Sequence, residues 1–405
     1  MAVEIAQIFQ DFAVIMIVAS IMTLISYKLK QPVIIGYIIA GMIIGPYTPP
    51  FSFILNIDIL SLFAEIGVVL LLFVVGMEFP IQKLRELGRK ILVIGITEAF
   101  GTFAIGTLVG LNVLHYSLSD SMFLALAVSV TSTVIIMRVL EEYDMIKERA
   151  SHILLSVTVV EDITIISMLA VLQSTTSTGT PSPIEILSSI GIVLAFIGGV
   201  LVIGSKTVPK FINFVGRTNQ HDILIVSILG IVFALSVIAH EIGISVATGA
   251  FFAGVLIAES KVHSVTKVLA TPIRDMFAAL FFVSVGALMD ISLIPVFILP
   301  AVVLVLVSMA SKFFTVFLAS RSQKIDIVSS LKLGFGSASS GGELALVVAK
   351  GGADVGATSS FILPMVGTMT VITTFIAPYL IKIGWKIANS FGKNRDNKHR
   401  NATEE

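Results

Sequence analysis

Long apolar segments follow one another along almost the whole chain, separated by short polar connectors. An α-helix needs about 20 apolar residues to cross a bilayer. Hydropathy predicts about thirteen such segments, near residues 6–27, 31–47, 58–77, 90–113, 119–140, 151–173, 184–205, 221–239, 242–259, 272–289, 293–319, 328–351 and 359–388. Only 13% of the residues are charged, against about 25% in soluble domains. The sequence therefore predicts an all-α polytopic membrane protein embedded in a lipid bilayer.

The two ends of the chain differ in character. Residues 1–388 are predicted to form one transmembrane unit, and residues 389–405 a disordered tail, because this last stretch is polar throughout. The first residues lack a basic region and a small-residue cleavage site, so we expect a retained helix and no signal peptide. Cysteine is absent, which excludes disulfides and thiolate ligands. The 26 basic and 26 acidic residues balance, and nucleic-acid binding is not expected.

Basic residues gather in alternate connectors. These connectors hold Lys28 and Lys30; Lys83, Arg85, Arg89 and Lys90; Lys147 and Arg149; Lys206, Lys210 and Arg217; Lys261, Lys267 and Arg274; and Arg321, Lys324 and Lys332. The opposite connectors, such as PYTPPFSFILN and QSTTSTGTPSPIE, contain almost no Lys or Arg. Because basic loops stay in the cytoplasm, this alternation predicts an N-terminus outside the cell and a cytoplasmic C-terminus.

Two adjacent acids, Glu161 and Asp162, occur near the middle of the apolar segment 151–173. Ionisable residues at such a depth are costly and usually functional. We expect Na+ or K+ and protons to compete for Asp162, because alkali cations favour oxygen ligands. Thr158, four residues earlier on the same helix face, offers another oxygen. Glu161 points about 100° away from Asp162 around the helix and can take a different partner.

Polar clusters interrupt two of the apolar segments. Thr131 and Ser132 open a hydroxyl cluster in the first segment, and the string GFGSASSGGE at 334–343 interrupts the second. By the loop count the two segments enter the membrane from opposite sides, as inverted repeats with two crossing broken helices would. Half-helix ends and freed carbonyls can bind a cation there, although small residues also serve close helix packing.

Other charges are predicted inside the membrane as well. Lys312 lies in the apolar string AVVLVLVSMASKFFTVFLAS and is interpreted as the charge partner of Glu161, with snorkelling to the surface as the alternative. Glu98 is either a proton relay or a structural partner of Arg138. Glu343 follows the second break and either orients it or carries a proton.

The chain resembles a known family, the monovalent cation:proton antiporter-2 group. This group contains NapA-type sodium/proton and Kef-type potassium/proton antiporters. The matching motifs are QPVIIGYIIAGMIIGP, FAEIGVVLLLFVVGMEF, SVTSTVIIMRVL, VVEDI, GISVATGAFFAGVLIAES, FFVSVGALMD and SGGELALVVA. The resemblance implies interleaved dimerisation and core ion-translocation parts, a homodimer, an elevator-like movement and a prokaryotic cell membrane. It also implies that Asp162 is the essential aspartate, Thr131 and Ser132 the unwound crossover, Thr158 a ligand hydroxyl and Lys312 the paired base.

The position before the aspartate separates branches of this family. It is Asp in electrogenic sodium antiporters, Asn in many electroneutral ones and Gln in Kef proteins, whereas this chain has Glu161. Secondary active exchange of a monovalent cation for protons is therefore predicted, with Na+ favoured over K+. The alternative is a Kef-type potassium efflux antiporter, or a channel-like protein, regulated by a separate subunit or domain.

Rival functions lack their motifs. His240-Glu241 begins a protease-like metal string, but Ile244 stands where the second histidine is needed. The sequence has no Walker loop for an ATP-driven pump and no TVGYG filter of a potassium channel. An organic-anion transporter would be expected to place basic residues at its site. We therefore expect neither an enzyme nor a bound cofactor.

Overall fold

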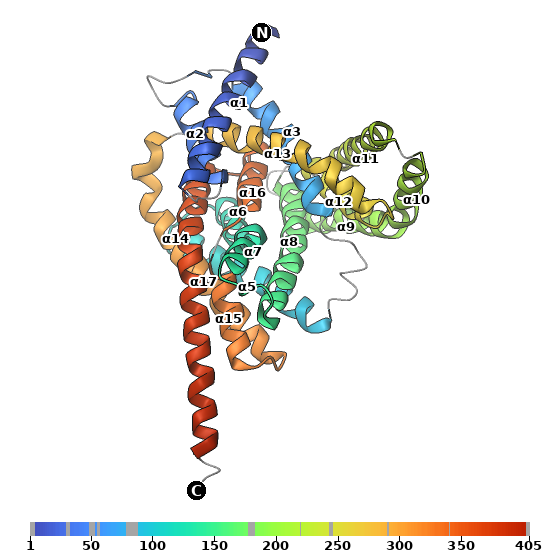
Figure 1. The fold of residues 1–405 in the computed structure, drawn as a ribbon. Coiled ribbons are helices and arrows are strands. Elements are labelled where there is room, and N and C mark those ends of the chain that lie inside the picture. Colours follow the sequence, from blue (N-terminus) through green and yellow to red (C-terminus); the bar gives the residue numbers. More distant parts are fainter. Residues whose placement is uncertain are drawn as a thin grey trace. The chain divides into compact units, whose positions relative to one another are not determined.

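A computed structural model of the chain describes residues 5–29, 33–47, 53–54, 57–77, 88–176, 183–218, 220–242, 246–289, 291–339 and 341–401. The described elements are all helical (Figure 1). They are α1 Ile5–Lys28, α2 Val33–Ile44, α3 Ile57–Met77, α5 Arg89–Asn112, α6 Leu118–Ser129, α7 Thr133–Glu142, α8 Arg149–Thr176, α9 Pro183–Gly199, α10 Ser205–Gly216, α11 His221–Glu241, α12 Val246–Ala258, α13 His263–Ala287, α14 Ile294–Ser322, α15 Ile327–Ser337, α16 Glu343–Asp354 and α17 Ile362–Asn401. A π-helical turn, Val200–Gly204, joins α9 to α10, and a short 3-10 turn, Ile291–Leu293, precedes α14.

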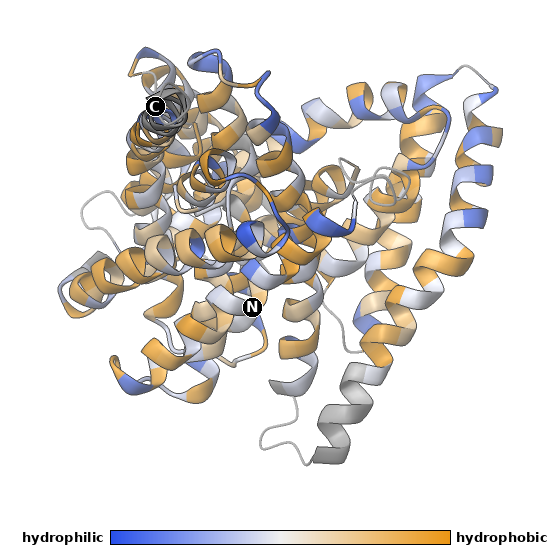
Figure 2. Ribbon diagram, turned by 90° about the horizontal axis from the view of Figure 1, so that it is seen from below, coloured by the Kyte–Doolittle hydropathy of each residue, from blue (hydrophilic) through white to orange (hydrophobic). Residues whose placement is uncertain are grey.

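The helices are long and apolar enough for a membrane. Among the described residues, nine helical spans could cross a bilayer by length and composition, and α2, α6 and α12 are shorter apolar helices. Hydrophobic residues make up most of the ribbon in Figure 2. Large apolar side chains such as Phe9 and Leu299 are exposed in the structure. The predicted all-α membrane fold is confirmed, whereas the count of thirteen crossings stays a prediction.

The chain divides into two compact units that alternate along the sequence. Unit 1 comprises Met1–Glu86, Ile166–Ile294 and Lys350–Pro364, and unit 2 comprises Leu87–Ile165, Pro295–Ala349 and Met365–Glu405. Of the five boundaries, three fall inside α8, α16 and α17, one falls at the start of α14, and one lies between α3 and α5. Each unit therefore has its own buried core, assembled from segments that are far apart in sequence.

Glycines allow the helices of unit 1 to pack closely. A Cβ atom on Gly254 of α12 would lie 2.0 Å from the carbonyl oxygen of Phe73 in α3. A Cβ atom on Gly41 of α2 would lie 2.0 Å from the carbonyl oxygen of Val283 in α13. Only a residue without a side chain fits at either crossing, so backbone meets backbone in both helix pairs.

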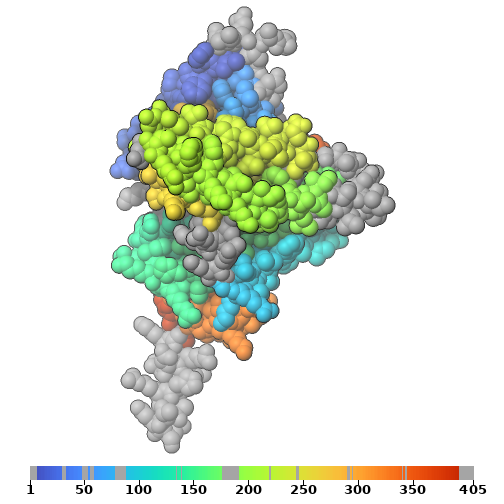
Figure 3. Space-filling view, turned by 90° about the vertical axis from the view of Figure 1, so that its right-hand side faces the viewer, coloured from blue at the N-terminus to red at the C-terminus, as the bar shows by residue number. Residues whose placement is uncertain are grey.

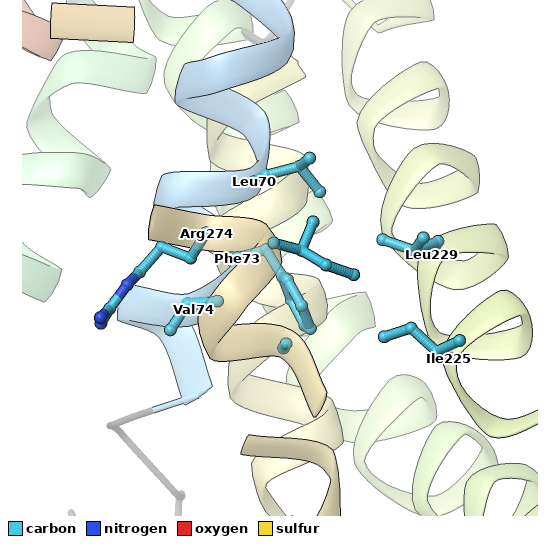
Figure 4. A pocket seen from close by; sticks show the side chains of 8 residues that line it. Leu70, Phe73, Val74, Ile225, Leu229 and Arg274 are labelled. Atoms are coloured by element: carbon cyan, nitrogen blue, oxygen red, sulfur yellow. The ribbon is translucent and has the colours of Figure 1, made fainter. Parts of the chain in front are cut away.

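An apolar gap beside these crossings separates α3 from α11. Leu70 and Phe73 face Leu229 and Ile225 across it, and the head group of Arg274 points away (Figure 4). The gap leaves no room for a water molecule. The interior of unit 1 is dry at this point, as expected for a lining of hydrocarbon side chains.

Two broken helices meet inside unit 2. The first break separates α6 from α7, and the Ser132 side chain caps α7 by accepting a hydrogen bond from the Ile135 amide at 3.3 Å. The second break separates α15 from α16, which begins at Glu343. A Cβ atom on Gly342 would lie 3.2 Å from the Ser132 Cα atom, so the two breaks are neighbours. Both interruptions predicted from the sequence are present in the structure.

The last helix differs from its prediction. α17 continues to Asn401, so residues 389–401 are helical where the polar composition predicted a disordered tail. A helix that has already nucleated gains one hydrogen bond for each residue it adds. The apolar first part of α17 supplies that nucleus, which a composition argument limited to the tail does not consider.

Candidate ion-binding site

Three buried acids meet where α8 packs against α5 in unit 2. Glu161 is fully buried and Asp162 is 7% exposed. Gly95 brings α5 close to α8, since a Cβ atom there would lie 2.7 Å from the Val160 Cβ atom. Glu98, about one turn after Gly95, is fully buried and lies within hydrogen-bonding reach of Glu161. The structure therefore adds Glu98 to the acidic pair predicted from the sequence.

Lys312 of α14 supplies the positive charge of this cluster. Its side chain is 1% exposed, and its charge interacts with Glu161 most strongly and then with Glu98 and Asp162. Its Nζ atom donates a hydrogen bond to the Val130 carbonyl oxygen in the first break. The negative end of the α6 dipole lies at this point, and a cation there is stabilising.

Hydroxyl groups complete the surroundings of the first break. Thr158 is fully buried; its Oγ1 atom accepts a hydrogen bond from Thr133 Oγ1 at 2.9 Å and donates one to the Leu155 carbonyl at 3.0 Å. Thr131 and Ser132 are also buried, and Thr131 faces the Glu161 carboxyl group. The structure thus gathers hydroxyl and carboxyl oxygens, which are the ligands that hard cations favour.

In the part of the chain that the structure describes, the hydrogen bonding of several of these oxygens is incomplete. Within the described residues, the carboxyl oxygens of Glu98 and Glu161 and the Thr131 hydroxyl are buried without a hydrogen bond of normal geometry. Buried polar atoms are costly unless they are paired. A hydrogen bond between two carboxyl groups requires a proton on one of them. The arrangement is therefore suited to hold either a proton or a partly dehydrated cation.

Two predicted site residues can be placed only by their helix position. Arg138 lies in α7, and Glu343 is the first residue of α16. Their side chains lie outside the described part of the structure. The alternatives considered for Glu98 with Arg138, and both roles considered for Glu343, stay predictions.

The structure also shows groups that the sequence reasoning missed. Ser308 Oγ donates a hydrogen bond to the Val128 carbonyl at 2.8 Å, one turn before Lys312 binds Val130. The i, i+4 spacing of Ser308 and Lys312 is a signal in the sequence, because it places both on one helix face. The backbone carbonyls that they bind leave no such signal.

A small cavity lies beside the second break. It measures about 20 Å³, enough for one water molecule. Its lining includes Val128, Ser308, Gly341 and Thr373, and the Thr373 hydroxyl accepts a hydrogen bond from the Gly341 amide at 3.0 Å. The region where the breaks meet therefore combines polar groups with free space.

Broken helices that meet beside buried charges define the class of ion-coupled secondary transporters. Residues 14–386 match the family model described as "Sodium/hydrogen exchanger, transmembrane". The chain belongs to this family.

Individual relatives cover the chain to different extents. YbaL of Escherichia coli (strain K12) is 30% identical over 324 residues, which are 76% of this chain and 57% of YbaL. The high-affinity Na(+)/H(+) antiporter NhaS3 of Synechocystis is 27% identical over 86% of this chain and 76% of its own length. The K(+)/H(+) antiporter subunit KhtU of Bacillus subtilis is 26% identical over 93% of this chain and 94% of its own length.

A solved structure shows the same fold. The sodium proton antiporter MjNhaP1 of Methanocaldococcus jannaschii aligns with a TM-score of 0.70, at 15% identity, over 95% of this chain and 98% of its own. The likeness extends over nearly all of both chains.

Proposed function

We propose that the protein exchanges a monovalent cation for protons across a membrane, with Asp162 as the group for which the two compete. The observation that carries this proposal is the burial of Asp162 and Glu161 beside the first break, with Lys312 facing them from α14. The names of NhaS3, KhtU and MjNhaP1 as cation/proton antiporters support the same reaction.

In this proposal the side chains have different roles in binding the cation and the proton. The Asp162 carboxylate and the Thr158 hydroxyl bind the dehydrated cation, with oxygens of the first break as further ligands. Protonation of Asp162 removes the negative charge and releases the cation. Glu161 forms or breaks its ion pair with Lys312 as a proton or a cation replaces the other at Asp162. The cluster therefore moves through the membrane with little net charge, because charge in hydrocarbon is costly.

The two units suggest how access alternates. Unit 2 contains all the residues of the candidate ion site. In this proposal it is the translocating part, and unit 1 contributes the dimerisation surface of a homodimer. The N-terminus lies outside a prokaryotic cell and the C-terminus in the cytoplasm.

The choice of cation is the finer part of the proposal. Glu161 with Lys312 gives the site an acid and a base beside Asp162, which favours Na+ and electrogenic exchange by resemblance to the sodium antiporters. Exchange of K+ under control of a separate subunit is the second candidate, and the naming of KhtU as an antiporter subunit supports it.

Proteoliposomes with an internal pH-reporting dye test the exchange. Addition of Na+ or K+ to vesicles of the wild-type protein should release protons from the acidic lumen, and clamping the membrane potential tells whether net charge moves. The variant Asp162→Asn should lose this response, because Asn neither titrates nor attracts a cation. The exposed Asp222→Asn is the matched control and should retain it. Coupled exchange by Asp162→Asn would disprove the site.

A further inference from the structure

A basic cavity in unit 1 lies outside the ion site. It is about 600 Å³ in volume and opens where α10 ends and α12 turns into α13. Its lining consists of Lys210, Asn213, Phe214, Gly216, Arg217, Lys261 and Val262. Three of these residues are basic and none is acidic, and all lie in the described part of the chain.

Specific contacts fix the walls of this cavity. The Lys261 amide donates a hydrogen bond to Asn213 Oδ1 at 2.7 Å, which ties the α12–α13 turn to α10. Gly216 lies against Val262, since a Cβ atom there would be 2.7 Å from the Val262 Cγ1 atom. The three cationic side chains are therefore presented from two connected walls, and not from a mobile loop.

The cavity lies at the end of two candidate membrane spans. The span Gly191–Gly216 ends at its wall, and the span His263–Ala287 begins beside it. Figure 3 shows residues 191–241, which include α10 and α11, in yellow-green on one face of unit 1. On α10 the side chains of Phe211 and Phe214 are 49% and 69% exposed, so an apolar surface lies next to the basic residues.

We propose that this cavity binds the phosphate head group of an anionic phospholipid. Basic pockets between helices at the membrane surface recognise such head groups. Lys210, Arg217 and Lys261 bind the phosphate oxygens, and the acyl chains lie along Phe211 and Phe214. A soluble anion would account for the basic walls, but it would make no apolar contact with the exposed aromatic side chains.

Native mass spectrometry of the full chain in detergent tests the site, with phosphatidylglycerol and phosphatidylcholine as probes. Wild-type protein should retain phosphatidylglycerol in preference to phosphatidylcholine. The double variant Lys210→Gln/Lys261→Gln should bind phosphatidylglycerol about tenfold more weakly or worse. Lys206→Gln, an exposed basic residue on the same helix but outside the cavity, is the control and should bind like the wild type.

A second measurement tells a lipid head group from free phosphate, and a second variant tells weaker binding from a folding defect. Inorganic phosphate at millimolar concentration should not displace phosphatidylglycerol; displacement would assign the cavity to a free anion and overturn the proposal. The single variant Arg217→Gln keeps the Asn213 contact and should also weaken binding if the double variant does not fold. The proposal would also be overturned if the wild type retained both lipids equally. The same holds if the cavity variants bound phosphatidylglycerol as strongly as the Lys206→Gln control.

Discussion

Lys312 connects the charged cluster to the backbone of the first break. Its Nζ atom binds the Val130 carbonyl, while its charge offsets Glu161, Glu98 and Asp162. A buried lysine that served only as a counter-ion would need only the acids. Here the same side chain also satisfies a carbonyl that the broken helix leaves free, so Lys312 links the backbone of the break to the acids.

The hydroxyl of Thr158 provides a test of the cation ligands. Thr158→Val removes the oxygen but keeps the shape of the side chain, and the KM for the cation should rise about fivefold to tenfold, equivalent to about 1 kcal/mol. Thr158→Ser retains the oxygen and should behave like the wild type in the same proteoliposome assay. An unchanged KM in Thr158→Val would remove this hydroxyl from the site.

Single residues were predictable from the sequence to the extent that they stand out in an apolar segment. Glu161, Asp162 and Lys312 do so, and the structure brings them together. Glu148 does not, because it lies in the charged stretch EEYDMIKER and not in an apolar segment. Its Oε2 atom accepts hydrogen bonds from Lys332 at 2.6 Å and from Trp385 at 3.1 Å. Partners so far apart in sequence cannot be identified from a local pattern.

Helix pairs in unit 1 depend on glycine at their crossings. Gly254→Ala places a methyl group against the Phe73 carbonyl in α3, and backbone atoms cannot move aside as a side chain does. We expect a loss of about 1–3 kcal/mol in the free energy of unfolding. Thermal unfolding in detergent measures it.

Gly230 of α11 is the matched control, since a Cβ atom there meets nothing within 4 Å. Gly230→Ala should leave stability unchanged or raise it by up to about 1 kcal/mol through helix propensity. Equal effects of the two substitutions would mean that the α3–α12 crossing is looser than the structure shows.

The start of α15 depends on a charged cap. Asp326 accepts a hydrogen bond from the Ser329 amide at 2.8 Å. Burial would raise the pKa of Asp326, but hydrogen bonds from the Ser329 and Val328 amides outweigh it and hold the pKa below 3.8. Asp326→Ala should destabilise the protein by about 1 kcal/mol at neutral pH. Asp326→Asn, which keeps an acceptor, should cost less.

The pH dependence of this cap follows from the direction of the shift. Because the pKa is lower in the folded protein than in the unfolded chain, the stabilisation is fully present above pH 3.8. It is lost as the pH falls through the folded-state pKa. The difference in unfolding temperature between the wild type and Asp326→Ala should therefore narrow in strongly acidic detergent solution. A constant difference at every pH would contradict a role for the charge.

Helices as units were largely predictable, because hydropathy marks each of them and small residues mark both breaks. The segment predicted at 184–205, by contrast, contains a π-helical turn at Val200–Gly204, and the helix continues as α10 to Gly216 where a connector was predicted. Apolar residues such as those of this turn fit either kind of helix, so composition does not distinguish them. The end of α17 was missed because propagation of a helix depends on the residues before the tail.

The whole molecule is predicted to cross the membrane with its basic connectors in the cytoplasm. The 405-residue sequence has no cysteine, so a single introduced thiol reports its own location. Lys324→Cys should react with a membrane-impermeant maleimide only after the cells are opened, and Val113→Cys should react with intact cells. Both side chains are exposed in the structure. The reverse pattern would invert the topology, and reaction of both in intact cells would contradict the alternation of loops.

The division into two units could not be predicted from hydropathy. Three of its five boundaries fall within α8, α16 and α17, where a helix continues across the boundary and no connector marks it in the sequence. What separates the units is which helix faces pack together, and this depends on contacts between distant segments. The resemblance to known antiporters implied interleaved parts, but it did not give their limits.

The bond between Lys312 and Val130 has a consequence for how this protein can change over evolution. Its acceptor is a peptide carbonyl, which every amino acid provides, so mutation of codon 130 cannot delete it. Position 130 is free to drift among apolar residues that fit a buried site, whereas position 312 must keep a long basic side chain. Selection on this contact therefore falls on one gene position only, and its loss requires no more than a single mutation.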